Sequence, residues 1–340
     1  MSPARVPNLS PEDLLRLLPM LSQVEERASG GQKQVFKAML TGRQIAIKVV
    51  LPDDDARLPV ADALASTVLV DPLASTVQLG AAAVVSDGDA DEESVDPVPA
   101  RLRREVNLLA SIDSPAIVPL IEIDGERIRA VSERGKSYLV YAEEWIDGDD
   151  LNQRLDRGRA TMEQAEVLRL ALDGVTGIAA LWRQEIVHRD IKPHNIVRRR
   201  EGGFVLIDLG LALDLQADSI TESGMWLGTL PFAAPEINDP EQRDLVDFRA
   251  DEFSLGLVLY EALAAFHPYQ ARTGGRTVTD VRRKFRARPV PLRDRVPTVD
   301  ADFAAIIMRM IETDMTLRYA RIGQLESALR AVAVRLGVSV

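Results

Sequence analysis

The amino-acid sequence predicts an α+β protein in which a small β-rich part precedes a larger, mainly helical part. Short segments before residue 145 are rich in β-branched residues and are separated by turn residues such as Thr41-Gly42. From Leu151 onward, apolar residues recur with helical spacing. Strands are expected over 34–39, 44–50, 117–123, 127–133 and 137–142, and helices over 161–184, 250–265 and 301–312.

Two further helices are expected outside the C-terminal half. Residues 10–18 begin with Ser10 as a candidate N-cap, followed by Pro11 and two acidic residues. Residues 1–21 are therefore interpreted as an N-terminal helical extension. The second helix starts at Arg101 and places Leu102, Val106 and Leu109 on one face.

Residues 51–100 differ from their surroundings and are interpreted as an acidic insertion. They hold eleven acidic residues and one basic residue, and therefore nearly all of the net charge of −11. Residues 64–68 and 73–77 are near-duplicates, and residues 86–94 are too polar to bury a core. Either residues 60–80 dock on the protein or on a partner, or the whole insertion is a tolerated loop without a role.

Composition excludes several classes of protein. The chain has no cysteine, so it can form neither a disulfide nor a thiolate zinc site. Asp62, Asp71 and Pro72 interrupt the most apolar window, residues 60–85, so no membrane span is predicted. Outside the insertion the positive and negative charges nearly balance, so the sequence shows no excess of basic residues that would indicate nucleic-acid binding. We expect a cytoplasmic protein with neither a nucleic-acid nor a membrane partner.

The strongest motif is His188-Arg189-Asp190-Ile191-Lys192-Pro193-His194-Asn195. It resembles the catalytic loop of the protein kinase family, and the lysine two residues after the aspartate resembles bacterial-type serine/threonine kinases. The resemblance implies that Asp190 accepts or orients the proton of the attacking hydroxyl. It also implies that Lys192 neutralises charge on the transferred phosphoryl group, and that Asn195 holds a metal ion.

Further segments follow in the order that this family requires. Ile207-Asp208-Leu209-Gly210 resembles the D-F-G element, which implies that Asp208 binds Mg²⁺. Ile45-Ala46-Ile47-Lys48 resembles the strand whose lysine grips the α- and β-phosphates of ATP. By the same resemblance, Lys48 pairs with Glu105 on the helix that begins at Arg101.

The end of the activation loop also matches, in residues 228–236. The resemblance places Thr229 in a hydrogen bond near Asp190 and Lys192, and it implies a buried ion pair between Glu236 and Arg318. Residues 251–256 resemble the start of the central helix, where Asp251 would brace the catalytic loop.

The nucleotide-binding residues depart from the family pattern in one place. In the glycine-rich loop Gly30 is in register and is followed by Gly31, but Ala28 and Lys33 replace the first and third glycines. Lys33 would add a phosphate contact. The resemblance places Glu143 at the gatekeeper position and Glu144 to Ile146 beside adenine, with Val35, Ala46 and Val197 above and below the ring.

The resemblance covers about residues 22–335 and implies a bilobal protein-kinase-like fold. Its small antiparallel β-sheet lobe, 22–146, includes the insertion and the family's αC helix, and its larger helical lobe is 147–340. We expect an ATP- and Mg²⁺-dependent serine/threonine protein kinase that acts on protein substrates and on its own activation loop, at Ser219, Thr221 or Ser223. The alternatives are a pseudokinase and a small-molecule phosphotransferase.

Overall fold

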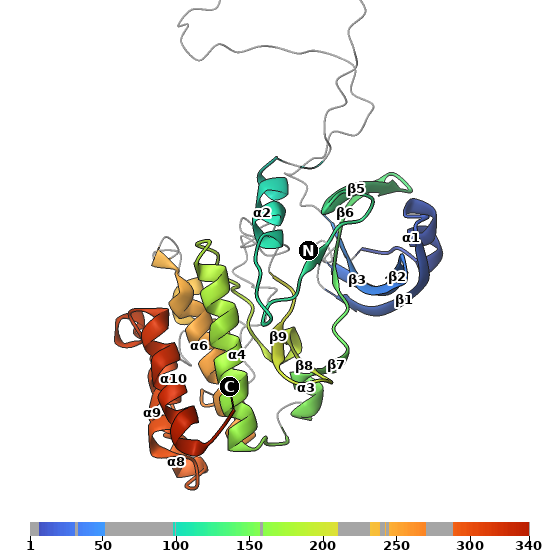
Figure 1. The fold of residues 1–340 in the computed structure, drawn as a ribbon. Coiled ribbons are helices and arrows are strands. Elements are labelled where there is room, and N and C mark those ends of the chain that lie inside the picture. Colours follow the sequence, from blue (N-terminus) through green and yellow to red (C-terminus); the bar gives the residue numbers. More distant parts are fainter. Residues whose placement is uncertain are drawn as a thin grey trace, which may run out of the picture.

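The computed structural model describes residues 7–30, 33–51, 98, 100–156, 159–209, 232–238, 242, 245–269 and 288–339. In these ranges a curved β-sheet region lies beside a larger helical region (Figure 1). The predicted order, a β-rich part followed by a helical part, is therefore confirmed.

One antiparallel sheet forms the N-terminal lobe. Its strands lie in the order β1-β2-β3-β6-β4, and β5 also pairs with β6. Turn residues in the left-handed region, Thr41 and Gly42, connect β2 to β3. The strands are β1 (Leu21–Gly30), β2 (Lys33–Leu40), β3 (Arg43–Val50), β4 (Leu120–Ile121), β5 (Ile128–Glu133) and β6 (Lys136–Glu144).

The two faces of this sheet bury different side chains. On one face Phe36, Ile47 and Val140 are fully buried and pack with Leu14 and Leu18, which come from α1 (Pro11–Leu17) and its C-terminal end. Ser10 caps α1 as predicted, and Asp13 completes a capping box with it. The predicted N-terminal helix therefore closes a small core over the sheet.

The opposite face of the sheet carries several ionisable side chains. Side chains alternate between the faces of a strand, and the strand register places Val35 opposite Lys48, Lys48 opposite Tyr141, and Ala46 opposite Glu143. Three ionisable side chains therefore share this face as diagonal neighbours, one from each of three adjacent strands: Lys33, Lys48 and Glu143.

The helix α2 (Ala100–Ala110) lies on the other side of the sheet from α1 (Figure 1). Val106 and Leu109 are buried in the same core as Leu209. The backbone of Glu105 belongs to this helix, but its side chain is outside the described part of the structure.

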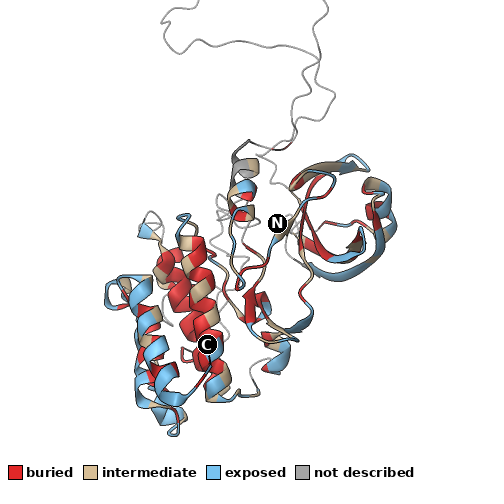
Figure 2. Cartoon of the chain, viewed as in Figure 1, coloured by how far each residue is buried: buried red, intermediate tan, exposed pale blue. Residues whose placement is uncertain are grey.

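Helices dominate the C-terminal lobe. Figure 2 shows that α4 and α6 are the buried centre, while α9 and α10 expose one side. The α4 and α6 helices approach closely because Gly174 has no side chain: a Cβ there would lie 2.8 Å from Leu255. The helices are α3 (Leu151–Arg154), α4 (Gln164–Trp182), α6 (Phe248–Ala264), α8 (Leu292–Arg295), α9 (Ala301–Met310) and α10 (Ile322–Leu336).

A small second sheet joins the two lobes. It consists of β7 (Gly148–Asp150), β8 (Ile196–Arg199) and β9 (Phe204–Leu206), paired in that order. The short 3-10 helices are η1 (Pro193–Asn195), η2 (Pro235–Asn238) and η4 (Met315–Leu317). Among the described residues, no helix combines the length and the apolar character needed to cross a bilayer.

Candidate active site

The segment between α4 and β8 gathers Asp190, Lys192 and Asn195 around one carboxylate. Lys192 Nζ donates to Asp190 Oδ2 at 2.7 Å, and Asn195 Nδ2 donates to the same oxygen at 2.8 Å. Asn195 Nδ2 also donates to the Asp190 carbonyl at 2.9 Å. These bonds fix the Asp190 carboxylate through Oδ2 and leave its other oxygen, Oδ1, without a hydrogen bond within the described residues.

Asp251 holds the backbone of this loop. Its carboxylate accepts the N–H of His188 at 2.7 Å and that of Arg189 at 2.9 Å, as the resemblance implied. Arg189 has a φ of 65°, in the left-handed region that a side chain disfavours, at a cost of about 1–3 kcal/mol. Burial raises the pKa of the Asp251 carboxyl, and His188 and the two backbone bonds offset only part of this effect. The strained backbone conformation next to Asp190 is thus fixed by a buried carboxylate.

Asp208 faces the sheet from the segment after β9. Its φ of 66° is also in the left-handed region. The backbone nearby is tied to the catalytic loop, because Ile207 N–H donates to the Asn195 carbonyl at 2.9 Å. Lys33 and Lys48 hold the pKa of Asp208 far below its usual range, against the opposing effect of burial. Asp208 is therefore ionised.

Lys48 is paired with a carboxylate that lies in its own sheet. Its Nζ is 3.3 Å from Glu143 Oε2 and 3.7 Å from Asp208 Oδ1. Burial lowers the pKa of Lys48, but Asp208 and Glu143 outweigh it, so the pKa is raised. Sequence reasoning placed Glu143 at the gatekeeper position but missed this ion pair. The available signal was an acidic residue directly after the apolar run Leu139–Ala142.

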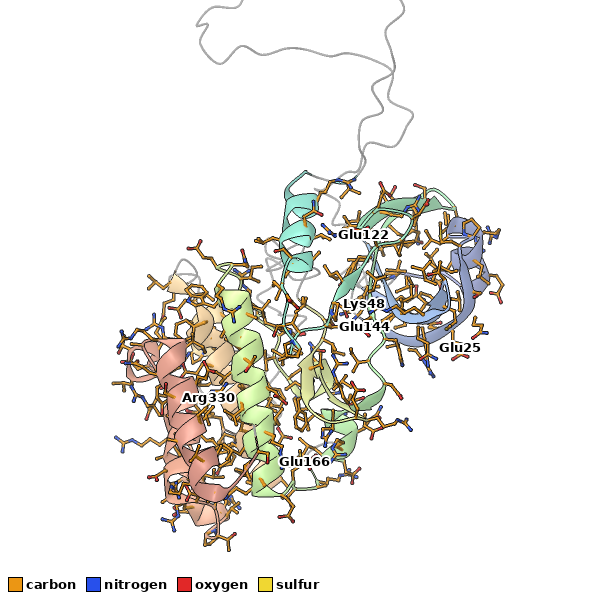
Figure 3. All side chains as sticks on the ribbon, in the orientation of Figure 1. Glu25, Lys48, Glu122, Glu144, Glu166 and Arg330 are labelled. Atoms are coloured by element: carbon orange, nitrogen blue, oxygen red, sulfur yellow. The ribbon has the colours of Figure 1, made fainter. Side chains whose placement is uncertain are left out.

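The expected adenine-contacting residues come from β2, from β3, from the end of β6 with the residues after it, and from β8. Ala46 of β3, Ile146 after β6 and Val197 of β8 each keep 8% of their surface exposed, and Val35 is half-buried. Figure 3 shows Lys48 and Glu144 on the part of the sheet that lies next to the helical lobe. The Glu144 side chain pairs with Arg43 at 3.2 Å, and its backbone N–H donates to the Pro119 carbonyl at 2.9 Å.

These residues fit Mg²⁺ and ATP. Asp208 offers an ionised carboxylate, and Asn195 keeps its side-chain carbonyl oxygen because its bonds to Asp190 use the amide nitrogen. Among the described residues, no three His, Asp or Glu side chains form a metal site of their own. Mg²⁺ typically binds to one or two carboxylates together with substrate phosphates. Within the described chain, the Ile146 amide and carbonyl have no hydrogen-bond partner, as an adenine site requires.

Some predicted residues are not placed. Gly31, Thr229 and the candidate phosphorylation sites Ser219, Thr221 and Ser223 lie outside the described residues, and so does the insertion from 52 to 97. Gly30 ends β1 opposite Lys33. The predicted pair of Glu236 and Arg318 is present and buried, with Nη1–Oε1 at 2.6 Å.

The fold has two lobes, and the candidate site joins residues of both, as the ion pair of Lys48 and Asp208 shows. The family model for the protein kinase domain matches residues 76–330, and the chain therefore belongs to the protein kinase family. The bilobal kinase fold expected from the sequence is confirmed. The match begins inside the acidic insertion, so the strands β1 to β3 precede it.

Curated bacterial kinases are similar to this chain. Serine/threonine-protein kinase PknJ of Mycobacterium tuberculosis is 31% identical over 68% of the chain and 38% of its own length. Serine/threonine-protein kinase PknB of the same species is 29% identical over 69% of the chain and 36% of its own length. A probable serine/threonine-protein kinase of Streptomyces coelicolor is 30% identical over 65% and 31%. The chain spans about a third of the length of these relatives.

Proposed function

We propose that this chain is an ATP- and Mg²⁺-dependent protein kinase that phosphorylates serine and threonine hydroxyls of proteins. The observation that carries the proposal is the arrangement of Lys192 and Asn195 around the Asp190 carboxylate, joined through the Asn195–Ile207 backbone bond to the ionised Asp208. The named activity of the bacterial relatives supports the same substrate class.

The residues have separate roles in this proposal. Asp190 orients the acceptor hydroxyl and takes up its proton, and Lys192 stabilises negative charge on the phosphoryl group in transit. Lys48 and the backbone around Gly30 and Gly31 position the phosphates, and Glu105 would help to orient Lys48 once nucleotide is bound. Asp208 and Asn195 would hold Mg²⁺, which supplies charge neutralisation at the phosphates. Catalysis then depends on positioning and electrostatics rather than on a covalent intermediate.

Two alternatives are tested by one assay. A pseudokinase would bind ATP without turnover, whereas a small-molecule phosphotransferase would label a small acceptor and leave proteins unlabelled. The assay supplies γ-labelled ATP with a generic protein substrate or with a mixture of small hydroxyl compounds. Labelled protein that depends on Mg²⁺ is expected. Bound ATP without any labelled product would indicate a pseudokinase, and labelled small acceptors alone would indicate the other class.

The activation loop is proposed as a substrate of the enzyme itself. A phosphate on Ser219, Thr221 or Ser223 would pair with Arg189, directly before Asp190, through charge-assisted hydrogen bonds. Mass spectrometry after incubation with Mg²⁺ and ATP should find phosphate on at least one of the three, with Thr221 and Ser223 favoured. An unmodified loop on enzyme that phosphorylates other proteins would refute this part of the proposal.

A further inference from the structure

Lys33 occupies an unusual position for a cation. It stands where the glycine-rich loop of the family has its third glycine, and it begins β2 opposite Gly30. Its Nζ forms an ion pair with Asp208 Oδ2, although the two residues are 175 positions apart in sequence. The Lys33 side chain is 22% exposed and that of Asp208 is 14% exposed. The ammonium therefore contacts the carboxylate that the proposed function assigns to Mg²⁺.

The positive charge of Lys33 needs a negatively charged partner close by. Burial and the neighbouring Lys48 lower the pKa of Lys33, and the Asp208 carboxylate offsets only part of this effect. Lys48 has two counter-ions, Glu143 at 3.3 Å and Asp208 at 3.7 Å, whereas the one ion pair of Lys33 within the described residues is with Asp208. If Mg²⁺ binds Asp208, Lys33 loses its counter-ion in a partly buried site, which is costly unless another anion replaces it.

Under the proposed function, the phosphates of ATP would be the anion nearest to Lys33. Lys33 and Lys48 project from the same face of the sheet, diagonally across β2 and β3, because Lys33 pairs with Val50 while Lys48 pairs with Val35. An ammonium group is a compact donor that binds phosphate well. The Lys33 side chain is flexible, so a small rotation would move its ammonium group from Asp208 to phosphates bound by Lys48. Its positive charge would then have a negative partner both before and after nucleotide binding.

We propose that Lys33 is a second phosphate-binding lysine that alternates between Asp208 in the nucleotide-free enzyme and the phosphates of bound Mg²⁺–ATP. This inference rests on the proposed function. In the nucleotide-free enzyme, the Lys33 ammonium group would then compete with Mg²⁺ for Asp208. Because the phosphates of ATP would draw Lys33 away from Asp208, the metal and ATP should bind together more tightly than either binds alone. No such coupling is expected from a glycine at this position.

The test compares Lys33→Met, Lys33→Arg and the control Lys136→Met in the full chain. Lys136 lies in the β5–β6 turn region, where it pairs in register with Glu133. Two affinities are measured by titration calorimetry: Mn²⁺ alone, and a non-hydrolysable ATP analogue at saturating Mg²⁺. The circular dichroism spectrum and the melting temperature of each variant establish that it is folded.

The two affinities should change in opposite directions. Lys33→Met should weaken analogue binding about tenfold, as expected for one charge-assisted hydrogen bond, while it strengthens binding of Mn²⁺ alone severalfold. Lys33→Arg should restore analogue binding, and Lys136→Met should match wild type. Unchanged analogue binding in Lys33→Met, or a parallel loss of both affinities, would overturn the inference. If wild type itself fails to bind the analogue, the proposed function fails as well.

Discussion

Lys48 Nζ lies 3.3 Å from Glu143 Oε2, and both side chains are almost completely buried. The pair joins two adjacent strands, so the position of Lys48 is set within the sheet itself. Glu143 Oε1 has no hydrogen-bond partner in the described structure. A buried charge without its partner lowers the stability of the folded protein, so removal of either Lys48 or Glu143 should be destabilising.

Replacement of Glu143 by glutamine should therefore destabilise the nucleotide-free protein. The loss of one charged partner predicts a decrease of about 1–3 kcal/mol in the free energy of unfolding, measured by urea denaturation. Mg²⁺–ATP should reduce the difference in unfolding free energy between Glu143→Gln and wild type, because the phosphates then balance the positive charge of Lys48. The matched control is Glu126→Gln, which removes an exposed pair with Arg129. Equal stabilities of the two variants would contradict the role given to Glu143.

The buried pair of Glu236 and Arg318 should be the most sensitive ion pair of the C-terminal lobe. Arg318 donates to both Glu236 oxygens, at 2.6 and 3.0 Å, and to the Glu312 carbonyl. Glu236→Gln leaves a buried cation without its counter-ion and should cost about 3–5 kcal/mol.

The control for this change removes the exposed ion pair of Arg330 and Glu326, which lies on α10 (Figure 3). Glu326→Gln should cost less than about 0.5 kcal/mol. Chemical denaturation of both variants measures the difference. A Glu236→Gln protein as stable as Glu326→Gln would show that the buried pair contributes nothing.

Glu252 should make stability depend on pH. Burial raises its pKa from an ordinary 4.5 to about 8, and only one of its oxygens has a partner in the described structure, the Tyr319 N–H. The folded protein then binds a proton that the unfolded chain releases, so stability due to Glu252 falls as pH rises from 4.5 to about 8.

The test is denaturation of wild type and Glu252→Gln between pH 5 and pH 9. Glutamine imitates the neutral acid, so the two proteins should be similar near pH 5. The stability of the variant relative to wild type should rise by up to about 1.4 kcal/mol per pH unit, until the pH exceeds the pKa of Glu252. A constant difference at all pH values would show that Glu252 does not titrate in this way.

The sequence predicts those contacts that depend on residues within one motif or on a family pattern. Asp251 could be assigned to the catalytic-loop backbone, and Glu236 to Arg318, because each belongs to a motif with a known partner. The pair of Lys48 and Glu143 could not, because it depends on the register that sets Ala46 opposite Glu143. The contact between Lys33 and Asp208 depends on how closely the two lobes approach, which no local pattern contains.

In the proposed function, Asp190 directs transfer of the γ-phosphate to a protein hydroxyl. The most direct measurement is phosphoamino acid analysis of a protein substrate after incubation with γ-labelled ATP and Mg²⁺, for wild type and Asp190→Asn at equal ATP occupancy. We expect phosphoserine or phosphothreonine with wild type and a rate lower by about a hundredfold or more with the variant. Undiminished labelling by Asp190→Asn, or no labelled hydroxyl amino acid with ATP-bound wild type, would contradict it.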